Sequence, residues 1–94
     1  MIASTVDPDG RTVDLTEERW AHIKRRHPDM AGRLRLIMQT VREPDRRMHG
    51  HTPDEEWFFT HLSGRLPWLR VSVHYEGERG WIATAFRQLR PPGS

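Results

Sequence analysis

The spacing of apolar residues changes from a helical to a strand period within this chain, and this change limits the fold more than any other feature. Over residues 30–41 the apolar side chains recur every three or four positions, which places them on one face of a helix. These residues are Met30, Leu34, Ile37, Met38 and Val41. From residue 56 onward apolar and polar residues alternate, as is typical of half-buried strands. Helices followed by consecutive strands predict an α+β fold with an antiparallel sheet.

Local signals divide the chain into expected elements. Thr16 is a good N-cap for a first helix over residues 17–27, which stops before Pro28 because the residue before proline avoids the helical region. A short strand is expected at residues 12–15, and further strands at residues 46–49, 56–62, 68–75 and 80–87. We expect residues 1–88 to form a single compact domain, with two N-terminal helices packed on a four-stranded antiparallel sheet and the other sheet face partly open. Residues 89–94 are a short Pro/Gly tail.

The basic residues are clustered, and nearly all of them are arginine. Of the 15 basic residues only Lys24 is a lysine. Residues 19–47 hold nine basic residues against three acidic ones, and residues 79–94 hold three basic residues and no acidic one. This distribution is typical of a protein that binds a polyanion, because arginine recognises phosphate with two parallel hydrogen bonds. A solvated helix face, or a genome rich in G and C, would explain the same numbers.

Several classes of protein are excluded by what the sequence lacks. Cysteine is absent, which excludes disulfides, thiolate metal sites and a cysteine nucleophile. His49 and His51 have no clear third ligand beside them, so they do not predict a metal site. No stretch of about 18 apolar residues is present, and the first residues do not resemble a secretory signal. We therefore expect a cytoplasmic protein with no metal, no cofactor and no membrane segment.

The six histidines, set among arginines, point to one kind of chemistry. Cleavage of an RNA phosphodiester needs a base for the ribose 2′-hydroxyl, an acid for the leaving oxygen, and cations for the charge on the phosphorane. The candidates are His22, Arg25, Arg26 and His27 on the first helix, and Arg70, His74, Thr84 and Arg87 on two later strands. Each has an ordinary alternative, because His27 can simply cap the helix and the others can be solvated or satisfied locally.

The segment LTEERWAHIKRRHPDM, residues 15–30, resembles the opening of small bacterial and phage domains in the barnase/EndoU/colicin/RelE-like ribonuclease superfamily. Such domains typically open with a strand and a Thr-capped helix that carries a Trp-x-His-Ile pattern and ends in Arg-His-Pro. The later pattern is similar too, with Pro-Asp at residues 44–45, an arginine-bearing strand, a Val-rich strand at residues 70–75 and a last strand around residues 82–86. This resemblance implies a barnase/RelE-like fold and a metal-independent ribonuclease, often a toxin or phage-associated effector.

The resemblance also suggests which residues act. The predicted catalytic residues are His27, His22, Arg46 and Thr84, which match the helix histidines, the arginine after Pro-Asp and the last-strand threonine. The predicted RNA- and phosphate-binding residues are Arg25, Arg26, Arg70 and Arg87, of which the last two follow from the strand pattern alone. Two features depart from the superfamily: Phe86 stands where Tyr is commoner, and residues 57–61 are unusually aromatic. Either departure fits a member that no longer cleaves RNA.

Three hypotheses follow for the function. The first is a small endoribonuclease toxin, whose partners are its RNA substrate and a cognate antitoxin or immunity protein. The second is a non-catalytic nucleic-acid- or protein-binding module of the same fold, in which Trp57, Trp68 or Trp81 stack on bases. The third is an antitoxin-like or assembly protein that binds its partner through strand edges. If Trp57 and Phe59 face away from the helices, the apolar surface favours a homodimer or another protein partner.

Overall fold

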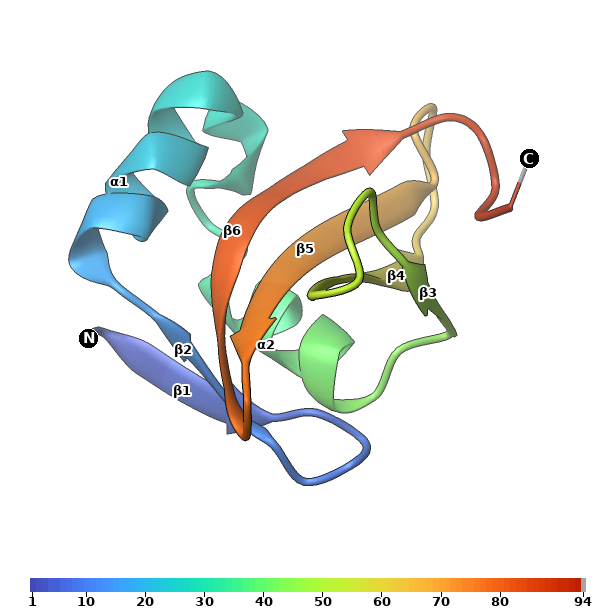
Figure 1. Cartoon of the computed structure of the whole chain (residues 1–94). Helices are drawn as coiled ribbons and strands as arrows, with labels where there is room; N and C mark the ends of the chain where they lie inside the picture. The colour runs from blue at the N-terminus through green and yellow to red at the C-terminus, as the bar shows by residue number, and fades with distance from the viewer. Residues whose placement is uncertain (94) are drawn as a thin grey trace.

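The structure is a computed structural model that describes residues 1–93, which form one sheet with two α-helices and a short 3₁₀ helix (Figure 1). The elements are β1 (Ala3–Val6), β2 (Thr12–Leu15), α1 (Glu17–Arg26), η1 (Pro28–Met30), α2 (Leu34–Arg42), β3 (Arg46–His49), β4 (Glu55–His61), β5 (Trp68–Glu76) and β6 (Arg79–Gln88). The strands lie in the order β1-β2-β6-β5-β4-β3. Neighbouring strands are antiparallel except β2 and β6, which run parallel.

The prediction of two N-terminal helices on a four-stranded antiparallel sheet is wrong. The hairpin of β1 and β2 precedes the helices, so the helices lie in the middle of the chain. The hairpin also extends the sheet, which is mixed and has six strands. β2 belongs to the sheet because it pairs with the start of β6 and buries Val13 and Leu15 in the core. Local periodicity does not reveal this pairing, since β1 and β2 have only four residues each and β6 lies at the other end of the chain.

Helix α1 confirms the predicted start and stop signals. The hydroxyl of Thr16 accepts a hydrogen bond from the N–H of Arg19 at 3.1 Å, as expected of an N-cap. The helix ends at His27, whose N–H donates to the carbonyl of Ile23, and Pro28 then begins η1. Helix α1 packs against β6. The cap residue His27 is therefore held at a defined point beside this strand.

Helix α2 confirms the apolar stripe but starts later than the stripe does. Its first residue is Leu34, because Pro28–Met30 forms the separate helix η1. Met30 is nevertheless buried, as are Ile37 and Val41. The stripe therefore faces the sheet, where α2 packs on β1, β4 and β5.

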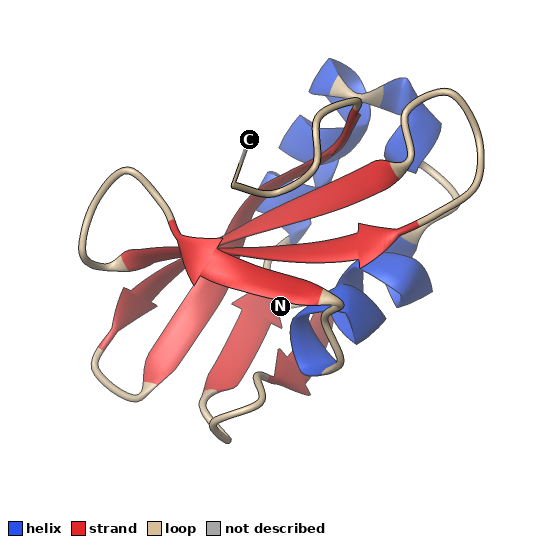
Figure 2. Cartoon of the chain, turned by 90° about the vertical axis from the view of Figure 1, so that its right-hand side faces the viewer, coloured by secondary structure: helices blue, strands red, loops and turns tan. Residues whose placement is uncertain are grey.

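The hydrophobic core lies between the helices and one face of the sheet. Its members on the sheet are Val13, Leu15, Phe58, Leu69, Val71, Val73, Tyr75, Ile82 and Ala85. In Figure 1, α2 lies behind the central strands and α1 lies beside β6. Figure 2 shows the helices gathered on one side of the twisted sheet. The opposite face is left without a helix over it in the part of the chain that the structure describes.

A β-bulge in β6 decides which of its residues share a face. Ser72 of β5 lies opposite Thr84, but the next residue, Val73, lies opposite Ile82, so Ala83 is the extra residue. Strict alternation would place Ile82, Thr84 and Phe86 on one face, but the bulge puts Ile82 on the helix side and Thr84 and Phe86 on the opposite side. The Ala83 carbonyl accepts hydrogen bonds from the Arg19 guanidinium, at 3.2 Å from Nε and 2.5 Å from Nη2. The bulge thus provides the point at which α1 is attached to β6.

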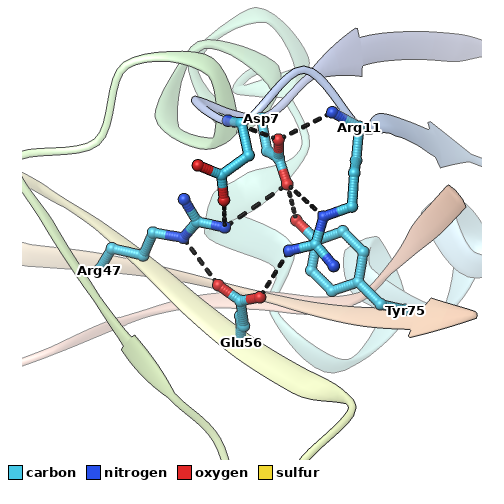
Figure 3. A network of polar contacts seen from close by, with 6 residues as sticks. Asp7, Arg11, Arg47, Glu56 and Tyr75 are labelled. Atoms are coloured by element: carbon cyan, nitrogen blue, oxygen red, sulfur yellow. Dashed lines mark hydrogen bonds and ion pairs between the residues drawn. The ribbon is translucent and has the colours of Figure 1, made fainter. Parts of the chain in front are cut away.

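On the helix side of the sheet, a polar network around Asp7 fixes the loop after β1 (Figure 3). The Asp7 side chain is fully buried and accepts hydrogen bonds from the Tyr75 hydroxyl at 2.7 Å and from two backbone N–H groups of its own loop. Arg11 and Arg47 each contact Glu56 at 2.7 Å, which joins the loop to β3 and β4. Burial alone would raise the pKa of Asp7, but the hydrogen bonds from Tyr75 and the backbone hold that pKa below its ordinary value.

Candidate functional site

The face of the sheet opposite the helices carries three of the eight predicted site residues, and we call it the open face. No helix covers it in residues 1–93, but residues 90–93 line a hollow together with Trp57, Phe59 and Arg70. Cross-strand partners lie on the same side of a sheet, so the strand register defines the members of the open face. They are Arg46 and Met48 of β3; Glu55, Trp57, Phe59 and His61 of β4; Trp68, Arg70, Ser72 and His74 of β5; and Trp81, Thr84, Phe86 and Gln88 of β6. The condition that Trp57 and Phe59 face away from the helices is therefore met.

At the centre of the open face, Arg70 lies between two aromatic rings. Its guanidinium carbon is 4.0 Å from the centre of the Trp57 ring and 4.3 Å from the centre of the Phe86 ring. Trp57, Arg70 and Phe86 come from three adjacent strands, and we call them the Arg70 clamp. Contacts of a guanidinium with ring faces are favourable, and they restrict the otherwise flexible side chain.

The Arg70 clamp lacks an acidic partner within residues 1–93. No carboxylate forms an ion pair with Arg70, and its Nε and the Nε1 of Trp57 are buried without a hydrogen-bond acceptor. Burial lowers the pKa of Arg70, and the charge of Glu55 offsets only part of that effect. A desolvated cation with unused donors is suited to bind an anion, because the protein has neither neutralised its charge nor satisfied its hydrogen bonds.

His27 reaches the same site from the end of α1. Its imidazole stacks on the Phe86 ring, with 5.2 Å between the ring centres and 27° between the ring planes. The Phe86 ring therefore contacts both the predicted acid–base residue and the unpaired cation. The helix stop at Pro28 and the attachment of Arg19 to Ala83 are what bring this histidine to the sheet.

Two more of the predicted residues lie near the clamp on the open face. Thr84 is next to Phe86 on this face and lies opposite Ser72, which is buried. Arg46 is exposed and lies in the same transverse row as Arg70, with Phe59 between them. Two strand spacings correspond to about 10 Å. The structure thus gathers His27, Arg70 and Thr84 closely, with Arg46 at the margin.

The remaining predicted residues lie away from the clamp. His22, Arg25 and Arg26 are on α1, and the two arginines are exposed with no hydrogen bond or ion pair in the described part of the chain. Desolvation and the neighbouring cations of α1 lower the pKa of His22. Arg87 donates to the carbonyls of Ser63 and Leu66, each at 2.7 Å, and so stabilises the turn between β4 and β5.

The structure also shows a pattern of paired aromatic rings that the sequence did not reveal. Each tryptophan of the open face has a histidine ring beside it. The pairs are His51 with Trp57 at 4.9 Å, His61 with Trp68 at 4.8 Å, and His74 with Trp81 at 4.7 Å between ring centres. The alternation within β4 and β5 hinted that these rings share a face, but the pairing depends on the cross-strand register and on the loop that carries His51. The open face is therefore an aromatic surface interspersed with groups that can carry positive charge.

Comparisons of this protein with protein-family models, with curated proteins and with solved structures gave no match. Within residues 1–93, no three side chains of the metal-ligating types come together. No helix in this part of the chain is long and apolar enough to cross a membrane. The chemistry of the open face is accordingly the basis on which a function can be argued.

Proposed function

We propose that this protein is a metal-independent endoribonuclease whose active site is the Arg70 clamp together with His27. The observation that supports the proposal most is the shared ring of Phe86, which contacts an unpaired, partly desolvated guanidinium on β5 and the imidazole at the end of α1. Both groups are close enough to contact the same nucleotide. The resemblance of residues 15–30 to the opening of ribonuclease domains is independent support from the sequence.

Each group has a defined task in the proposed reaction. His27 takes the proton of the ribose 2′-hydroxyl, and the 2′-oxygen attacks the adjacent phosphorus. The bond from phosphorus to the 5′-oxygen breaks, the leaving oxygen takes a proton from water, and the products end in a 2′,3′-cyclic phosphate and a 5′-hydroxyl. Arg70 stabilises the extra negative charge on the phosphorane, and Thr84 donates a hydrogen bond from the neighbouring row.

Residues around the clamp contribute by charge. Arg46 on β3 and the exposed Arg25 and Arg26 of α1 lie on either side of the open face, where they attract the RNA backbone. His22 belongs to the same basic helix surface and acts with them. A role as a toxin, with a cognate antitoxin or immunity protein as partner, stays a prediction.

The experiment that tests the proposal is incubation of the purified protein with mixed RNA in the presence of EDTA, followed by analysis of the product ends. We expect cleavage that survives chelation, leaves 2′,3′-cyclic phosphates and is lost in His27→Ala. His49→Ala is the matched control, because His49 is exposed on β3 and does not belong to the open face. Equal activity of His27→Ala and the wild type would contradict the assignment of His27 as the catalytic base. Absence of any cleavage would contradict the proposal that the protein is a ribonuclease.

A second candidate function is a non-catalytic module that binds single-stranded nucleic acid. The three histidine–tryptophan pairs favour it, because partly exposed aromatic rings on a sheet face that also carries Arg46 and Arg70 are suited to stack on unpaired bases. This function predicts RNA binding that weakens steeply with salt and yields no product. The same incubation, followed by a binding measurement at two salt concentrations, distinguishes the two functions.

A further inference from the structure

A hollow separate from the Arg70 clamp lies at the end of the open face where α1 begins and β2 meets β6. It is lined by Asp14, Thr16, Arg19, Glu76, Arg79, Gly80 and Trp81, and its volume is about 820 Å³. Pockets that hold small organic groups have volumes of this order. None of these residues takes part in the proposed cleavage reaction.

The side chains of this hollow combine a flat ring with fixed charges. The Trp81 ring is only partly buried, and the tilted ring of His74 supports it at 4.7 Å. Arg79 is held by Asp14 at 2.7 Å, and that ion pair, with a hydrogen bond from Ser4, lowers the pKa of Asp14. The exposed carboxylate of Glu76, in contrast, makes no hydrogen bond or ion pair with any side chain of residues 1–93. The hollow therefore offers a stacking surface and one unused acceptor.

The hollow and the Arg70 clamp are parts of one continuous surface. Trp81 lies opposite His74, and Phe86 lies opposite Arg70, so both sites can be placed along the single strand β5. Four residues separate His74 from Arg70, which corresponds to about 13 Å along a strand. A nucleic-acid strand that reaches both sites must therefore extend beyond the nucleotide held at the clamp.

We infer that this hollow is a base-binding subsite for a single-stranded RNA whose backbone lies on the Arg70 clamp, an inference that rests on the proposed function. The base stacks on Trp81, and Glu76 accepts a hydrogen bond from an amino group on the edge of the base. Cytosine, adenine and guanine carry such a group, whereas uracil presents a carbonyl oxygen in place of the cytosine amino group and can donate only its ring N3–H, so we expect it to bind more weakly. The subsite thus selects RNA by the identity of a base beyond the cleaved bond.

Binding of uncleavable oligonucleotides tests this subsite separately from catalysis. Fluorescein-labelled hexanucleotides of cytidine or uridine, 2′-O-methylated so that no 2′-hydroxyl can attack, are titrated and followed by anisotropy. We expect Trp81→Ala to weaken binding of the cytidine hexanucleotide about tenfold, and Trp81→Phe to restore most of the affinity because a ring remains. Melting temperatures of all variants confirm that they are folded.

The carboxylate has its own matched pair of variants. Glu76→Gln should reduce the preference for the cytidine over the uridine hexanucleotide, because an amide can also donate to a carbonyl oxygen. Glu78→Gln, which removes the same charge from the same hairpin outside the hollow, should leave the preference unchanged. If both variants change the preference equally, Glu76 acts only through its negative charge, and its role in selecting the base is overturned.

The outcomes separate the subsite from the nuclease. Unchanged hexanucleotide binding in folded Trp81→Ala overturns the subsite, whether or not the protein cleaves RNA. Weakened binding in Trp81→Ala by a protein that never cleaves RNA supports the subsite and rejects the nuclease.

Discussion

The guanidinium carbon of Arg70 lies 4.0 Å from the centre of the Trp57 ring, and each of these residues has a buried nitrogen without a hydrogen-bond acceptor in residues 1–93. Buried donors without acceptors are uncommon, because each one forfeits the hydrogen bonds that it makes with water in the unfolded chain. At this position the loss is understandable if a ligand completes the site. An RNA phosphate at the Arg70 clamp would supply a counter-charge, and it would reach the two buried nitrogens only if the surrounding rings move.

The clamp predicts that Arg70 cannot be replaced by lysine. A guanidinium is planar and stacks on rings, whereas an ammonium is a compact, strongly hydrated charge that does not fill the space between them. We expect Arg70→Lys to lose about tenfold in RNA cleavage and Arg70→Ala about 100-fold. Initial rates on a labelled oligonucleotide measure both values. Full activity in Arg70→Lys would show that charge alone is needed and that the rings are irrelevant.

The second prediction concerns Phe86 as a positioning residue. Phe86→Tyr keeps a ring on which His27 can stack, and it introduces the residue that is commoner in the ribonuclease superfamily, so we expect near wild-type activity. Phe86→Leu removes the ring, and we expect cleavage to fall about tenfold because His27 and Arg70 lose their common support. NMR distinguishes positioning from general damage, since ring stacking displaces the resonances of the His27 imidazole protons. These resonances should move in Phe86→Leu and stay in place in Phe86→Tyr, and unchanged resonances in both variants would exclude the positioning role.

Local chemistry was sufficient to predict most of the elements. Thr16 and Pro28 bound α1 because a hydroxyl cap and a following proline act on their immediate neighbours. β4 and β5 were predicted because period-two alternation is a property of each strand alone. The parallel pairing of β2 with β6 escaped prediction, because its stabilisation comes from burial against elements far away in the sequence.

Some residues of the candidate site could be named from the sequence, but their arrangement could not. His27 and Arg70 were candidates because their chemistry suits phosphodiester cleavage, yet their meeting at one ring depends on the register of β5 and β6. The bulge at Ala83 moves Phe86 to the same face as Trp81, and no local signal marks that extra residue. Phe86 departs from the superfamily pattern, and on that ground the sequence suggested a member that no longer cleaves RNA. In the structure, the ring of Phe86 contacts both His27 and Arg70.

The polar network on the helix side of the sheet predicts a stability effect that is separate from function. Asp7→Asn removes a fully buried carboxylate that holds Tyr75, Arg11 and the loop backbone, and we expect a loss of about 3 kcal/mol in the free energy of unfolding. The control is Asp9→Asn. Asp9 contacts Arg47 at 2.9 Å, but its side chain is 63% exposed, so its removal should cost less than about 1 kcal/mol. Urea unfolding measures both values. Equal losses of unfolding free energy in the two variants would show that the burial of Asp7 does not increase its contribution to stability.

Acid should destabilise the protein through the same carboxylate. Because the pKa of Asp7 is lowered in the folded chain, its charge contributes stability that is complete above the unfolded value of about 4 and is lost as the pH falls towards the lower folded value. Urea unfolding between pH 7 and pH 2 should therefore show the free-energy difference between the wild type and Asp7→Asn shrinking below about pH 4. Asp14, whose pKa is also lowered, titrates in both proteins and cancels in that difference. A difference that stays constant down to pH 2 would contradict a stabilised Asp7 carboxylate in the folded state.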